Sequence, residues 1–270
     1  ATLMEIPRVF TDPDYRKRKL DRITNPTVVD FWQKEAVKAT GENSLANMAP
    51  YITSKFNNFI SNDYVRPIIG QPHSALNFRE IMDGKKILLV NLSKGRIGDI
   101  NAGLLGMVLV GKILMAALSR VDIPDPKART DFNLYIDEFQ NFTTESIATI
   151  LSEARKYGLN LTMAHQFIGQ LTEKIRDAVF GNVGSVVCFR VGADDAEFLE
   201  KQFAPVFSKS DLVNIANYHA YVKLLIRGVT TPPFSLETLP GAHGNPSLAE
   251  ATKKVSRLRY GQDLKEIEAN

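Results

Sequence analysis

The sequence predicts an α/β fold, a parallel sheet with helices on its two faces, preceded by a small, mostly helical subdomain. Strand-like and helix-like segments alternate after about residue 85, and the strands are apolar on both faces. A length of 270 residues, with 44% hydrophobic and 23% charged residues, suits one large domain and a smaller one. We therefore expect a helical subdomain at 1–84, an α/β core at 85–240 and a polar, partly helical tail at 241–270.

The first 84 residues contain few strand-like runs. We expect helices over Asp14–Leu20, Val28–Thr40 and Leu45–Phe59, because their apolar residues recur at helical spacing. The prolines expected to interrupt this region are Pro13, Pro26, Pro50 and Pro67. The subdomain is predicted to end near Asp83-Gly84.

The segments from 85 to 158 open the α/β core. The expected elements are a strand at Lys86–Leu92, a buried helix at Asp99–Arg120, a strand at Phe132–Ile136 and a helix that begins at Thr143 or Thr144. That last helix has Glu145 in its first turn, an apolar face of Ile147, Ile150, Leu151 and Ala154, and Gly158 as its stop signal.

The remaining segments continue the alternation. They predict strands at Leu159–Ala164, Ser185–Phe189 and Ala220–Ile226, with helices at Glu173–Phe180 and Ala193–Phe203 between them, and a helix-prone Ser247–Arg259 in the tail. The apolar run Ala102–Leu118 is shorter than a membrane span and contains Lys112, so we expect a helix buried on nearly all sides.

Charge and cysteine content exclude little about partners. A net charge of +3 is too weak to indicate nucleic acid or an anionic membrane. The single cysteine, Cys188, excludes an internal disulfide and lies in an apolar run, which predicts a buried structural thiol.

Two adjacent carboxylates follow the predicted strand Phe132–Ile136. In parallel sheets ligands gather at the carboxyl ends of strands, and an apolar strand that ends in two acids has the Walker B pattern. Asp137 is then predicted to hold Mg²⁺, directly or through water, and Glu138 to polarise the water that attacks a γ-phosphate.

The next two strands also end in polar residues. Leu159–Ala164 leads to Gln166, which can sense a γ-phosphate or orient the attacking water, and Ser185–Phe189 leads to Arg190, which can reach a nucleotide held by a neighbouring subunit. The alternative for the glutamine is a solvated turn, and the alternative for the arginine is a surface charge. Three consecutive strand ends favour the functional interpretation.

No phosphate-binding loop accompanies these residues. Gly106–Ile113 approaches the GxxxxGK[ST] pattern, but its intervening residues are bulky and apolar within a helical run, and Ile113 has no hydroxyl for Mg²⁺. The loop Ser93–Gly98 lies between a strand and a helix but lacks the fingerprint. We reject the first candidate and interpret the second as an accessory loop.

Several motifs resemble those of type IV coupling proteins, the TraG/TraD-like conjugative DNA-transfer ATPases of the HerA/FtsK group of ring motors. These motifs are Leu134–Phe142, Glu153–Gly158, Ala164–Gln166, Asn91–Gly95, Pro233–Ser235 and Ser256–Tyr260. The resemblance covers most of the chain, and residues 85–240 most specifically.

The resemblance implies a RecA-like P-loop NTPase fold, ATP and Mg²⁺ as cofactors, and a homo-oligomeric, hexameric ring. It implies DNA, single-stranded and with its relaxase, pumped toward type IV secretion channel components. By the same likeness residues 10–80 resemble the all-α insertion of coupling proteins, Asp137 and Glu138 are the Walker B pair, Gln166 is the sensor and Arg190 is the candidate arginine finger.

The missing Walker A loop is the departure from the family pattern. We expect that loop, and any membrane anchor, to lie upstream of Ala1, with the parent protein in the cytoplasm at the inner face of the cell membrane. We expect these 270 residues alone to be inactive in ATP hydrolysis. Two alternatives stay open: a HerA-like DNA-processing helicase, and a non-hydrolysing module that docks a DNA–protein substrate.

Overall fold

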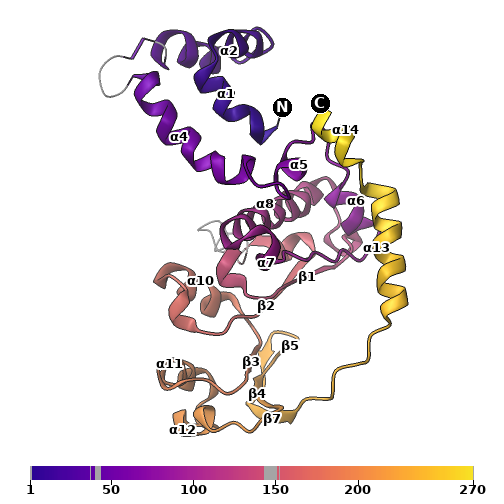
Figure 1. Ribbon diagram of the computed structural model, residues 1–270. Coiled ribbons are helices and arrows are strands. Elements are labelled where there is room, and N and C mark those ends of the chain that lie inside the picture. The colour runs from indigo at the N-terminus through magenta and orange to yellow at the C-terminus, as the bar shows by residue number, and fades with distance from the viewer. Residues whose placement is uncertain (1, 37, 40–43, 143–150, 152, 270) are drawn as a thin grey trace. The chain divides into compact units, whose positions relative to one another are not determined.

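The computed structural model describes residues 2–36, 38–39, 44–142, 151 and 153–269 (Figure 1). They cluster into two compact units, each assembled from segments that are separate in sequence. The first unit comprises Ala1–Asn77, Val90–Leu105 and Leu248–Asn270, and the second comprises Phe78–Leu89 and Gly106–Ser247. The segment predicted as a tail therefore contributes most of its length to the first unit.

The first unit contains only helices among its described elements. They are η1 (Leu3–Glu5), α1 (Ile6–Thr11), α2 (Pro13–Leu20), α3 (Pro26–Asp30), the π-helix η2 (Phe31–Ala36), α4 (Leu45–Ile60), α5 (Arg66–Ile69), α7 (Lys94–Ile97), α13 (Pro246–Tyr260) and α14 (Leu264–Ala269). Pro13, Pro26 and Pro67 open helices, where a missing N–H costs little. The break predicted at Pro50 is wrong, because α4 continues across this single lost backbone bond.

Arg16 joins α2 to α1 within this unit. Its side chain is buried, and its guanidinium donates hydrogen bonds to the carbonyls of Val9 at 2.9 Å and Phe10 at 3.3 Å. These two carbonyls lie near the end of α1, where a helix leaves backbone acceptors without partners. Arg16 therefore fixes the turn between the two helices.

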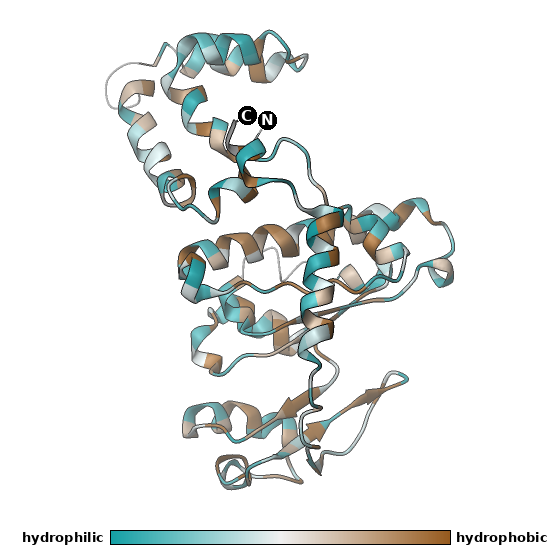
Figure 2. Cartoon of the chain, turned by 45° about the vertical axis from the view of Figure 1, so that its right-hand side comes forward, coloured by the Kyte–Doolittle hydropathy of each residue, from teal (hydrophilic) through white to brown (hydrophobic). Residues whose placement is uncertain are grey.

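The long helix α8 (Asp99–Leu118) runs from one unit into the other. Figure 2 shows brown predominating along it, and in the described part of the chain only the segment Asp99–Asp122 is long and apolar enough to cross a membrane. The prediction of burial on nearly all sides is wrong: 33% of the most apolar window is buried. Ala102, Ile113 and Ala117 are buried, whereas Met115 is 70% exposed, because neighbouring elements cover one face of the helix.

The second unit holds two main sheets. β1 (Phe132–Ile136) pairs in parallel with β2 (Leu159–Met163), from Phe132 opposite Leu159 to Ile136 opposite Met163. The other sheet is antiparallel, in the order β3 (Val186–Cys188), β4 (His219–Lys223), β7 (Phe234–Glu237). Parallel pairing, predicted for β1 to β4, is thus found for β1 and β2, while β3 runs antiparallel to β4, and β7 was not predicted as a strand.

Two further strand predictions need correction. The strand expected at Ala220–Ile226 is divided between β4 and β5 (Leu225–Ile226). β5 forms a hairpin with β6 (Val229–Thr230) because Arg227 and Gly228 both adopt positive φ, at 51° and 81°. Lys86–Leu92 is no strand: among the described residues it has no sheet partner, and Ile87 is 88% exposed.

The helices of the second unit are short apart from α8. They are α6 (Phe78–Asp83), η4 (Ser119–Asp122), η5 (Pro126–Ala128), η6 (Phe139–Phe142), η7 (Ala154–Tyr157), η8 (Ile168–Gln170), α10 (Glu173–Asn182), α11 (Ala193–Phe203) and α12 (Lys209–Val213). The expected helix start at Thr143 or Thr144, with Glu145, Ile147 and Ile150, lies outside the described residues. Gly158 ends η7 at φ 71°, which confirms it as a stop signal.

Each sheet has its own apolar core. The core of the parallel pair consists of Ile136, Phe139, Leu171, Ile175 and Val179, with Val110 of α8 packed against it. The core of the antiparallel sheet consists of Ile168, Cys188, Ala196, Leu199, Phe203, Leu212 and Ile215. Phe180 packs against both cores and joins them.

Arg120 ties together the starts of β1 and β2. Its side chain is fully buried and donates hydrogen bonds to the carbonyls of Thr130 at 2.8 Å and Tyr157 at 3.0 Å, each two residues before its strand. Asp83 balances the charge at 3.0 Å. A buried guanidinium needs a paired charge and acceptors for its donors, and here Nε also donates to Asp83 Oδ1 at 3.0 Å, while Nη2 has no hydrogen-bond partner among the described residues. Arg120 thereby fixes the register that aligns the opposite ends of the two strands.

Candidate active site

The Asp137-Glu138 turn follows β1 directly and has an unusual backbone conformation. Glu138 has φ 51°, a left-handed conformation that is uncommon for residues other than glycine. Its N–H donates to Asp137 Oδ1 at 3.0 Å, and its carbonyl accepts from the Asn141 backbone N–H at 3.0 Å and from Asn141 Nδ2 at 2.9 Å. Such conformations persist where the surrounding bonds over-determine them.

The turn is also fastened to the end of β2. The Ala164 N–H donates to the Ile136 carbonyl at 2.9 Å, and the Phe139 N–H donates to the Ala164 carbonyl at 3.0 Å. Phe139 is 1% exposed and lies in the core below, with the His165 ring edge-on at 5.2 Å. Backbone hydrogen bonds between the two chain segments thus continue beyond the ends of both strands. Together with the buried Phe139 they hold the acidic turn in place.

Both oxygens of the Glu138 carboxylate accept hydrogen bonds from glutamine amides. Gln166 Nε2 donates to Oε1 at 2.8 Å, and Gln140 Nε2 donates to Oε2 at 2.5 Å. The structure therefore brings together Glu138 and Gln166, which the sequence predicted on neighbouring strand ends. Gln140 was not predicted as a site residue. No sequence pattern signals this contact, because it depends on the left-handed backbone conformation of Glu138.

Asp137 has the exposure and free oxygen that a magnesium ligand needs. One oxygen accepts the Glu138 N–H, and the side chain is otherwise open to solvent. Mg²⁺ is usually held by one or two carboxylates together with phosphate oxygens and water, so a single carboxylate here fits that requirement. Among the described residues no cluster of three or more potential metal ligands is present.

Arg190 lies apart from the other three predicted residues. It is exposed, and its guanidinium donates to Asn217 Oδ1 at 3.2 Å. Because β3 and β4 are antiparallel, the carboxyl end of β3 meets the start of β4. No hydrogen bond or ion pair of the described chain joins Arg190 to Asp137, Glu138 or Gln166. Its role as a finger toward another subunit stays a prediction.

Neither glycine-bearing candidate forms a phosphate loop. Gly106–Ile113 lies inside α8, and a Cβ at Gly106 would come within 2.1 Å of the Phe142 ring, so this glycine serves close packing. Lys94–Ile97 forms a single helical turn, and Lys94 Nζ lies 3.5 Å from Asp99 Oδ1. The rejection of Gly106–Ile113 is confirmed.

Burial shifts the pKa of two further titratable groups, His165 beside the site and Cys188 in the core of the antiparallel sheet. Burial lowers the pKa of His165, although the charges of Asp195 and Glu138 oppose the shift. Burial, with a smaller contribution from the Asp195 charge, raises the pKa of the Cys188 thiol to about 11. Cys188 is thus the buried structural thiol that the sequence predicted.

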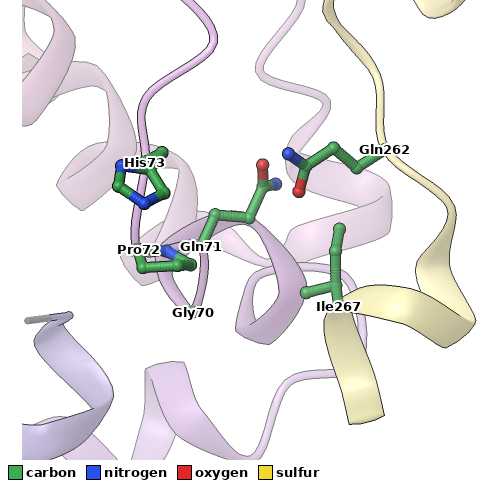
Figure 3. Close-up of a pocket in the computed structure, with 6 residues that line it drawn as sticks. All are labelled: Gly70, Gln71, Pro72, His73, Gln262 and Ile267. Atoms are coloured by element: carbon green, nitrogen blue, oxygen red, sulfur yellow. The ribbon is translucent and has the colours of Figure 1, made fainter. Parts of the chain in front are cut away.

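The first unit contains a small hollow of about 190 Å³, shown in Figure 3. Its lining residues are Gly70, Gln71, Pro72, His73, Gln262 and Ile267. The Gln71 and Gln262 amides point toward one another across it, and His73 is the only titratable group among the lining residues. This lining offers no pair of groups for acid–base chemistry.

Residues 131–214 match a family model described as the TraM recognition site of TraD and TraG. The matched span runs from the residue before β1 to the residue after α12, so it contains the acidic turn, Gln166 and Arg190. Residues 131–214 are thus similar to this region of the TraG/TraD-like coupling proteins, and the predicted resemblance is confirmed. Neither a curated protein nor a solved structure matches the chain.

Proposed function

We propose that these residues form the water-activating side of the ATPase site in a DNA-translocating coupling protein. One observation carries the proposal: Glu138 Oε1 and Gln166 Nε2 lie 2.8 Å apart at the ends of two adjacent parallel strands, within a coupling-protein region. A carboxylate and an amide at that edge of a sheet are suited to orient water beside a phosphate.

Each side chain has a distinct task in this proposal. Asp137 would hold Mg²⁺, Glu138 would accept a hydrogen bond from the attacking water, and Gln166 would donate toward the γ-phosphate or the water. When bound, Mg-ATP supplies the phosphoryl group and the charge neutralisation. Gly106–Ile113, the segment that approaches the phosphate-loop pattern, is helical, so it offers no phosphate cradle.

The proposed RecA-like P-loop fold is consistent with the incomplete pairing of the sheets. β1–β2 and β3–β4–β7 are separate, and the apolar segment Ile87–Val90 has no sheet partner among the described residues. The backbone of an apolar extended segment can pair with a strand that another part of the polypeptide supplies. We propose that the strand supplied to Ile87–Val90 in the parent protein is the one that leads into the phosphate loop.

The proposed partners follow from the family. In the parent protein the motor would form a hexameric ring, move single-stranded DNA with its relaxase toward a type IV secretion channel, and work in the cytoplasm beside the inner face of the membrane. A HerA-like helicase would share the site but serve DNA processing. Neighbouring genes for a relaxase or a secretion channel distinguish these two.

A second candidate function is the docking of a protein partner without hydrolysis. The family description favours it, because TraM recognition is the property for which the matched region is named. In that case residues 131–214 would bind a TraM-like relaxosome protein, and Glu138 would have no catalytic task.

ATP hydrolysis by the parent protein separates the two candidates. We expect DNA to stimulate hydrolysis by the full-length polypeptide, and we expect negligible hydrolysis by the 270 residues alone, which lack the phosphate loop. Binding of purified TraM-like protein, measured by calorimetry on the same two preparations, tests the docking candidate. Rapid DNA-stimulated hydrolysis by the 270 residues would contradict the proposed division of the site.

A further inference from the structure

Gln140 and Gln166 bind the same carboxylate but lie in different surroundings. Gln140 is half-buried in η6, one residue after the fully packed Phe139 and two residues after Glu138. Gln166 is exposed and lies on the irregular segment between β2 and η8. The Gln140 contact is therefore local and rigid, whereas the Gln166 contact joins two segments across the sheet edge.

The two contacts also differ in what else the amide can reach. An amide group offers two N–H donors, and the side chain of Gln166 is exposed to solvent, so one donor can turn to another acceptor. Gln140 lies within the acidic turn and shares its anchoring bonds, from Phe139 N–H to Ala164 O and from Asn141 to Glu138 O. Gln140 therefore stays with Glu138 when Gln166 turns to another acceptor.

A free glutamate side chain samples several rotamers, so its carboxylate needs support to act on one water. Ordering such a long side chain costs conformational entropy, because it loses its rotamer freedom. Each carboxylate oxygen can accept more than one hydrogen bond, so an amide on Oε2 still leaves a lone pair for water. A fixed donor at Oε2 thus orients the carboxylate without using up its capacity.

We propose that Gln140 is a positioning residue that keeps the Glu138 carboxylate oriented while Gln166 exchanges between Glu138 and the nucleotide. The inference rests on the proposed ATPase function and adds a division of labour between the two glutamines. Gln140 acts through Glu138 and touches no reacting atom, and Gln166 is the arm that responds to the ligand.

Substitutions of Gln140 in the full-length protein test this role. Gln140→Ala removes the donor, and we expect kcat for ATP hydrolysis to fall roughly 10- to 100-fold, as for a lost hydrogen bond to a charged group, with KM for ATP changed less than about twofold. Gln140→Glu keeps the size but sets a second carboxylate against Glu138, and we expect kcat to fall at least as far.

Gln170 provides the matched control, because it is exposed in η8. Gln170→Ala and Gln170→Glu should keep the parental kcat.

The order of the two Gln140 variants separates positioning from packing. If Gln140 only filled space, Gln140→Ala would be the more damaging change and the isosteric Gln140→Glu would be close to the parent. That order, or an unchanged kcat in both variants, overturns the proposal. Gln140→Glu also serves where Gln140→Ala fails to fold, and thermal unfolding of both variants shows which case applies.

A Glu138→Gln variant, assayed in parallel, distinguishes this inference from the proposed function. If Glu138→Gln loses hydrolysis while both Gln140 variants keep it, Gln140 has no positioning role and the ATPase assignment stands. If Glu138→Gln hydrolyses ATP at the parental rate, the ATPase assignment itself fails. In the ¹⁵N-labelled 270-residue chain, Glu138→Gln should shift the Gln140 side-chain amide signals and leave those of Gln170 in place. Unshifted Gln140 signals would overturn the contact.

Discussion

The parallel pair β1–β2 and the antiparallel sheet β3–β4–β7 bring different neighbours to the polar residues at their strand ends. At the end of β1, Glu138 meets Gln166 from β2, because both strands finish at the same edge. At the end of β3, Arg190 meets Asn217, which precedes β4, because β4 runs the other way. Strand direction therefore decides which of three similar sequence signals converge.

The two sheets also differ in how rigidly they hold the polar residue at the strand end. The parallel pair fixes a strained acidic turn through the buried Phe139 and the bonds of Glu138 to Asn141 and Asp137. The antiparallel sheet is followed by an exposed Arg190, whose guanidinium donates to Asn217 Oδ1. A rigid carboxylate suits a chemical step, and an exposed arginine suits contact with another molecule.

The largest expected difference in stability between the two strand ends is that between two phenylalanine substitutions in the 270-residue chain. Phe139→Ala empties a fully packed position beneath the acidic turn, and we expect it to lower the free energy of unfolding by about 3–5 kcal/mol. Phe189→Ala, at the end of β3 where the side chain is 53% exposed, should cost less than about 1 kcal/mol. Urea unfolding followed by circular dichroism measures both. Equal losses would show that the two strand ends are not differently anchored.

The reactivity of Cys188 tests the packed face of the antiparallel sheet. Burial raises the pKa of this thiol from 9.0 to about 11, so at pH 8 its thiolate fraction is about 100-fold lower than in the unfolded chain. We expect reaction with Ellman's reagent to be slower by at least that factor in the native protein than in urea. The unfolded thiol ionises first, so stability should decline as pH rises from 9 toward 11. An equal rate of reaction with Ellman's reagent in the native protein and in urea would show that Cys188 is not buried.

Gly158 gives the smallest expected effect and tests the alignment of β2 with β1. It adopts φ 71°, and an added Cβ would lie 3.1 Å from the Thr130 carbonyl oxygen, so Gly158→Ala should cost about 1–2 kcal/mol of unfolding free energy. Gly169→Ala, where an added Cβ meets nothing within 4 Å, is the control and should change stability little. Thermal unfolding compares the two. An unchanged free energy of unfolding in Gly158→Ala would show that the left-handed conformation of Gly158 is not needed to align the two strands.

Local patterns in the sequence predicted much of the parallel pair. Phe132–Ile136 and Leu159–Met163 are strands because each is a short apolar run ahead of a polar turn, and Gly158 marks the preceding stop. The pairing of Glu138 with Gln166 followed from strand direction alone. The role of Gln140 was missed because it depends on the left-handed conformation of Glu138, which no sequence pattern specifies.

Long-range pairing was the part that the sequence did not predict. An apolar run such as Lys86–Leu92 becomes a strand only where a partner supplies the ladder, and the described residues supply none. β3 and β4 are apolar like parallel strands, but their pairing direction is set by contacts across more than 30 residues. The exposed face of α8 likewise depends on which elements cover it.

The effect of Glu138→Gln on ATP hydrolysis by the full-length protein tests the central claim most directly. Glu173→Gln is the matched control, because the Glu173 side chain is 82% exposed at the start of α10, in the same unit. We predict that Glu138→Gln lowers kcat by about 100-fold or more while a fluorescent ATP analogue still binds, and that Glu173→Gln hydrolyses at the parental rate. A parental kcat in Glu138→Gln would contradict the assignment of the acidic turn as the water-activating site.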